Sequence, residues 1–114
     1  MEISKADWKL FRERITGWQE AYMDRLTKEY ITLLSADKIA SERFWELEKR
    51  IREDKTSPGV HLRLRKADLR IDLLKLLWDK VITPDDLTGF SDDLKDTVLH
   101  LYDVYSREDE PDGQ

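Results

Sequence analysis

The sequence predicts an all-α fold, a small helical bundle of three longer helices, a short turn helix and a C-terminal helix. Three observations support this. Apolar residues recur every three or four positions over long stretches, as on one face of a helix. Glycine and proline are few, 4 and 3 in 114 residues. Charged residues make up 39% of the chain, a density typical of helices with one solvated face.

The length and the apolar content predict one domain around a single core. The chain has 114 residues, of which 39% are hydrophobic. We expect the domain to cover residues 1–106. Residues 107–114 are charged and carry no apolar side chain, so a disordered acidic tail is expected there.

The first helix is expected over residues 5–34. Ser4 and Asp7 have the spacing of a capping box at its start. At 1.5 Å per residue such a helix is about 45 Å long, more than the width of a domain this small, so one end should overhang. The predicted buried stripe consists of Trp8, Phe11, Ile15, Trp18, Tyr22, Leu26, Tyr30 and Leu33.

A second helix is expected from about Ser41 to the break at "DKTSPG". Phe44, Leu47 and Ile51 form its apolar stripe. Trp45 lies about 100° away from Phe44 on the helical wheel, off that stripe. The position predicts that Trp45 meets another helix or anchors a partner.

The third helix is expected over residues 60–81. Its first half, "VHLRLR", alternates like a strand, but the sequence offers no strand to pair with it. Apolar residues cover most of its wheel, which predicts a central, mostly buried helix. The narrow polar sector that we expect to face solvent consists of Arg65, Asp68, Asp72, Lys75 and Asp79.

Two helix starts follow each other in "TPDDLTGFSDDLK". Thr83 is suited to cap a single turn with Pro84 at its first position, and Gly89 is expected to end that turn. Ser91 should cap the last helix, whose stripe begins at Leu94.

The residue types argue against an enzyme. The chain has no cysteine and only two histidines, and its four glycines are too scattered for a phosphate-binding loop. Asp96, His100 and Asp103 share one helix face, but a solvated face explains them better than a metal site. We therefore expect no catalytic residue, no cofactor and no metal.

A basic segment between residues 49 and 70 suggests an alternative function, nucleic-acid binding. It holds eight basic and three acidic side chains. Ion pairs with the acidic C-terminal part are the competing explanation for these charges. The candidate basic patch consists of Lys49, Arg50, Arg52, Arg63, Lys66 and Arg70.

The charge is unevenly distributed, which suggests a second alternative. Residues 1–84 carry a net charge of +3 and residues 85–114 one of −8. An acidic end of this kind could mimic DNA and inhibit a DNA-binding protein, although a solvated helix with a solubilising tail explains it as well. The candidate acidic patch consists of Asp85, Asp86, Asp92, Asp93, Asp96 and Asp103.

The leading interpretation is a small cytoplasmic protein-interaction or regulatory module without enzymatic activity. It would bind another protein, or a second copy of itself through the overlong first helix. Trp45, Trp8 and Phe11 are the candidate partner-binding residues. No stretch approaches 18 consecutive apolar residues, so no contact with a membrane is expected.

The segments "FWELEKRI", "DKTSPGV" and "ITPDDLTGFSDDLK" resemble a family of short, uncharacterised bacterial proteins that are all-helical. The resemblance extends over residues 3 to about 100 and implies a bacterial, cytoplasmic setting. Such proteins often carry the label "multidrug transporter" in genome annotation, which the lack of a membrane-spanning segment contradicts. The resemblance implies no catalytic residues.

Overall fold

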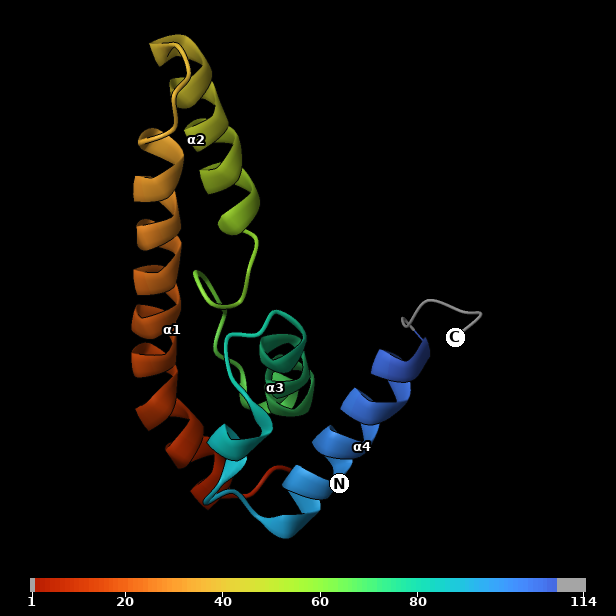
Figure 1. The fold of residues 1–114 in the computed structure, drawn as a ribbon. Coiled ribbons are helices and arrows are strands. Elements are labelled where there is room, and N and C mark those ends of the chain that lie inside the picture. Colours follow the sequence, from red (N-terminus) through yellow and green to blue (C-terminus); the bar gives the residue numbers. More distant parts are fainter. Residues whose placement is uncertain (1, 109–114) are drawn as a thin grey trace.

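The computed structural model describes residues 2–108 and confirms the all-α prediction. Its helices are α1 (Lys5–Leu34), α2 (Ala40–Asp54), α3 (Leu69–Trp78) and α4 (Asp92–Glu108), as Figure 1 shows. Two short 3₁₀ turns, η1 (Lys66–Asp68) and η2 (Pro84–Leu87), precede α3 and α4. The described part of the chain contains no strand.

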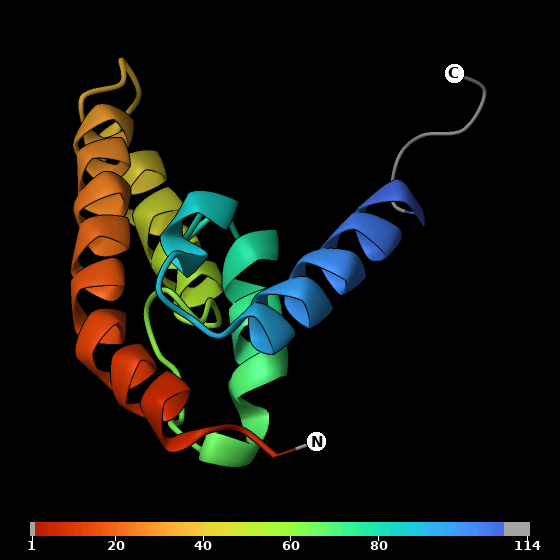
Figure 2. The same ribbon diagram turned by 90° about the horizontal axis from the view of Figure 1, so that it is seen from below.

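The helices form two parts that share α1. The first half of α1 packs with α3, η2 and α4, while its second half runs beside α2 away from that core (Figures 1 and 2). We call residues 26–55, the end of α1 with α2 and their connection, the arm. The molecule is accordingly elongated, with extents of 54 × 40 × 21 Å. The expected overhang of the first helix is therefore present, and α2 accompanies it.

The start of α1 is fixed by two sets of hydrogen bonds. The Ser4 side chain accepts a hydrogen bond from the Asp7 backbone N–H at 3.1 Å, which confirms the predicted cap. The buried Asp7 carboxylate accepts hydrogen bonds from the Ser91 N–H at 2.8 Å and the Ser91 hydroxyl at 2.6 Å. Ser91 in turn caps α4 at the Leu94 N–H. The two helix starts are thus tied together across 84 positions of sequence.

The core lies between the first half of α1, α3 and α4. Phe11 and Ile15 of α1 meet the leucines of α3, and η2 and α4 close the cluster. The prediction that the third helix is central is confirmed, since α3 contributes more fully buried side chains than any other described element. The largest fully buried side chains are Phe11, Leu69, Leu73, Leu74, Leu76, Leu77, Leu87 and Val98.

The predicted extent of the third helix is wrong at its start. Residues 61–65 are not helical, and Arg65 has extended backbone angles (φ −134°, ψ 127°). The alternation in "VHLRLR" fits this conformation: Leu62 packs against the core, whereas Leu64 is exposed. Extended backbone advances about 3.3 Å per residue against 1.5 Å in a helix, so these five residues cover about twice the distance that a helix of the same length would. No partner strand is needed for that.

The domain boundary expected at residue 106 stays a prediction. Helix α4 continues to Glu108, beyond the expected boundary at residue 106. The rest of the expected acidic tail, residues 109–114, lies outside the described residues.

The connection between α3 and α4 is held against α1 by arginines. Arg14 donates hydrogen bonds to the carbonyl oxygens of Asp86 at 3.0 Å and Thr88 at 2.5 Å, and Arg25 donates to that of Lys80 at 2.7 Å. Gly89 lies under the Arg14 guanidinium with φ +100°, a conformation that favours glycine. As predicted, this glycine follows the single turn that Thr83 begins.

Gly59 lies where the chain leaves the arm and touches α1. A Cβ atom at this position would come within 2.4 Å of the Tyr22 ring and 2.7 Å of Val81. We expect Gly59→Ala to lower the free energy of unfolding by about 1–3 kcal/mol, because backbone or ring must move to relieve the overlap. Urea unfolding followed by circular dichroism measures this. Gly17→Ala is the matched control; a Cβ there meets nothing within 4 Å, so unchanged or raised stability is expected.

Candidate functional site

The arm carries most of the large apolar side chains that the described part of the chain exposes. Helix α2 has no buried residue at all. Phe44 and Trp45 are 62% and 63% exposed, and their rings form an edge-to-face pair with centroids 4.9 Å apart. The exposed apolar residues of the arm are Ile31, Leu34, Ile39, Phe44, Trp45 and Ile51. So much exposed apolar surface on one projection is typical of an interaction site.

Polar contacts hold α2 against α1. Arg50 pairs with Glu29 at 2.8 Å, and the Tyr30 hydroxyl donates a 2.5 Å hydrogen bond to Asp54. Burial, together with that bond, raises the pKa of Tyr30 to about 12. The helix therefore turns polar groups toward α1, and Phe44 and Trp45 are left on the outside.

The exposed apolar side chains of α2 border a groove. We call its lining the arm groove; it consists of Phe44, Leu47, Glu48, Ile51, Arg52 and Lys55. A second hollow continues from it along α1 through Met23, Leu26 and Tyr30, and Ile51 and Lys55 line both. Glu48 and Arg52 form an i,i+4 ion pair at 3.5 Å. Lys55 forms no ion pair within residues 2–108.

Of the three predicted partner-binding residues, Trp45 is exposed, Trp8 is half-buried and Phe11 is buried. Phe11 has no exposed surface, because its ring lies in the core between Trp8 and Trp18. Trp8 is half-buried and packs against the same core. Both residues belong to the inward-facing stripe of α1. The structure therefore corrects the prediction that these two side chains contact a partner. Phe44, which the sequence assigned to an inward stripe, is exposed instead.

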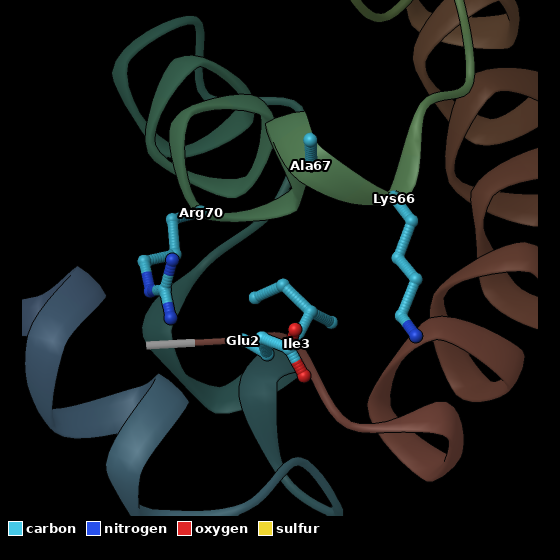
Figure 3. A pocket seen from close by; sticks show the side chains of 5 residues that line it. All are labelled: Glu2, Ile3, Lys66, Ala67 and Arg70. Atoms are coloured by element: carbon cyan, nitrogen blue, oxygen red, sulfur yellow. The ribbon is translucent and has the colours of Figure 1, made fainter.

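The candidate basic patch is divided between two parts of the molecule. Arg50 and Arg52 lie on the arm and pair with acidic residues of the arm, not with the C-terminal part. Lys49 is exposed on the same helix. Lys66 and Arg70 lie near the N-terminal segment, where they flank a hollow that Glu2 and Ile3 also line (Figure 3). The six cations are thus distributed over α2, the non-helical segment that contains Arg63, η1 and α3.

The candidate acidic residues lie on η2 and α4, where local roles account for several of them. Asp86 accepts a 2.7 Å hydrogen bond from the Thr83 N–H, as a capping box requires. Asp92 and Asp93 occupy the first turn of α4 and complement its dipole. Asp85, Asp96 and Asp103 are exposed.

The prediction that Asp72 faces solvent is wrong. Its side chain lies in α3 with 4% exposure, and its Oδ2 atom has no hydrogen-bond partner in the described structure. Burial, and then the nearby Asp68 carboxylate, raise the pKa of Asp72 to about 6, although Lys75 opposes the rise. The helical wheel could not reveal this burial, because it shows which residues share a face but not which faces other elements cover.

The described residues offer neither a metal site nor a membrane-spanning helix. Among residues 2–108, no three side chains of the metal-binding types gather in a way that could hold a metal ion. None of the helices in this range is long and apolar enough to cross a membrane.

The comparisons with known proteins give no relative: no family model, no curated protein and no solved structure matches the chain.

Proposed function

We propose that the protein is a small, non-enzymatic protein-interaction or regulatory module, and that the arm is its docking surface. The proposal extends to a bacterial, cytoplasmic setting, as the resemblance of the sequence implies. The observation that supports it best is α2, a 15-residue helix without a buried side chain that exposes Phe44 and Trp45 side by side.

The energetics of an exposed aromatic pair favour this function. A helical hairpin has no core of its own, and its apolar face gains free energy only when another surface covers it. Aromatic side chains that sit in the middle of an interface contribute most to binding. Polar residues surround Trp45, among them Glu42 and Lys49, as in the polar rim of an interface.

Site-specific photo-cross-linking in living bacteria tests the proposal. We expect Trp45→benzoylphenylalanine to give discrete covalent adducts after irradiation, because a docked protein lies within reach of this side chain. Asp79→benzoylphenylalanine is the matched control, since Asp79 is exposed at the end of α3, outside the arm. Adducts at position 45 that are absent at position 79 support the proposal. Equal labelling at both positions, or none at position 45, contradicts it.

A further inference from the structure

The lining of the arm groove follows one face of α2, and like any helix face with this spacing it can meet a second copy of itself in antiparallel register. Its lining residues are spaced by 3, 1, 3, 1 and 3 positions, so the pattern reads the same in both directions along α2. In a two-fold dimer of antiparallel helices, a residue i faces the residue j of the other copy for which the sum i + j is constant. With the axis between residues 49 and 50, the lining set maps onto itself.

The two ends of the groove carry different kinds of side chain, and each end suits the other. Phe44 and Glu48 lie toward the start of the groove, and Arg52 and Lys55 lie toward its end. In the antiparallel arrangement, the start of one groove meets the end of the other. Lys55 then approaches the aromatic ring of Phe44 at each end, with Glu48 one helical turn further in. Leu47 and Ile51 lie nearer the middle, opposite Arg52 and Glu48 of the other copy.

We propose that the occupant of the arm groove is α2 of a second copy of this chain, packed antiparallel across a two-fold axis. Phe44 of each copy lies against Lys55 of the other, and Glu48 lies between Ile51 and Lys55 of the other. This inference rests on the proposed docking function of the arm and identifies the docked partner as a second copy of the chain.

The charges of the groove are only partly satisfied within one copy. The Glu48–Arg52 pair is 3.5 Å long, and both of its side chains are about half exposed, so it stabilises the monomer little. Lys55 has no ion pair among the described residues, although it borders two apolar hollows. A carboxylate from the facing helix would complete the arrangement.

The size of the helix limits the strength of the dimer. With 15 residues, α2 is about 22 Å long, and one helix pair of this length covers less than the roughly 800 Å² per partner of a standard interface. We therefore expect dissociation in the micromolar range, visible as a sedimentation coefficient that rises with concentration.

Charge exchange between two variants of the full chain tests the proposal. Glu48→Lys places three cations in the groove of each copy, and Lys55→Glu places a second carboxylate beside Glu48 of the other copy. We expect each variant alone to dimerise about 10-fold more weakly than the unmodified chain, because the two-fold axis doubles every substitution. Mixed at equal amounts, they should form heterodimers at least as tightly as the unmodified chain, since both ends then pair opposite charges.

Sedimentation velocity and native mass spectrometry measure these species, and circular dichroism shows that both variants fold. Lys9→Glu, at an exposed position of α1 outside the arm, is the matched control and should leave dimerisation unchanged. Weak self-association of each variant that mixing restores supports the antiparallel dimer. An unmodified chain that stays monomeric at all concentrations, or a mixture no tighter than its components, overturns it.

The outcome is separable from that of the docking proposal. If the chain is monomeric but position 45 still gives cross-linked adducts whose mass is not twice that of the chain, the arm binds a different protein and only the dimer is wrong. If position 45 gives no adducts and no dimer forms, both proposals fail.

Discussion

Phe11→Ala is expected to lower the free energy of unfolding by about 3–5 kcal/mol, the largest effect of any substitution considered for this protein. The side chain is fully buried between α1 and the leucines of α3. Removing a buried ring costs its transfer free energy and leaves a cavity that the neighbouring helices fill only partly. Urea unfolding at neutral pH, followed by circular dichroism, measures the loss.

Phe44→Ala provides the matched control, because the same chemical change occurs on the exposed face of α2. At 62% exposure, we expect the free energy of unfolding of the monomer to change by about 0.5 kcal/mol or less. The contrast decides which aromatic residues form the core and which are available for docking. A loss at position 44 as large as that at position 11 would mean that α2 packs into the core, contrary to the structure.

Asp72→Asn is expected to raise the free energy of unfolding at pH 7 by about 1–3 kcal/mol. The pKa of Asp72 is about 6 in the folded protein, against an ordinary value of 3.8. Between these values the folded state binds more protons than the unfolded state, so stability falls as pH rises through this interval. A pKa difference of about 2 corresponds to roughly 3 kcal/mol, which residual solvent around the carboxylate reduces.

The pH dependence identifies the cause of the Asp72 effect. The advantage of Asp72→Asn should be complete above about pH 7 and should vanish below about pH 4, where both states carry the protonated acid. Unfolding by urea at a series of pH values measures it, with Asp96→Asn as an exposed control on α4. A gain at position 72 that is independent of pH would show that burial of the charge is not the cause.

The first helix and the capped starts were predictable from sequence because their signals are local. An eight-residue stripe at helical spacing needs no partner to be recognised, and Ser4 and Ser91 act on N–H groups three residues ahead. The second role of Asp7, which receives two hydrogen bonds from Ser91, depends on contacts across 84 positions. No periodicity in the sequence signals such a contact.

The candidate site was predictable only in part, and Trp45 and Phe44 illustrate why. The wheel correctly separated Trp45 from the stripe of its helix. It could not decide whether that stripe was covered, since covering requires another element at the right place. Helix α1 is long enough to carry α2 away from α3 and α4, so the stripe is left largely uncovered (Figure 1). The basic patch illustrates the same limit, because cations that are close in sequence are distributed over α2, the segment 61–65, η1 and α3.

The sequence by itself determined the all-α class, the extent of the first helix, the caps of the first and last helices and the central position of the leucine-rich segment. Each follows from interactions between residues a few positions apart, or from the amount of apolar surface that one segment must bury. Only the tertiary structure decided that residues 61–65 are extended, that Asp72 is buried and that α2 has no buried face. These properties depend on which surfaces meet across the fold, and burial is a property of the neighbours as much as of the residue.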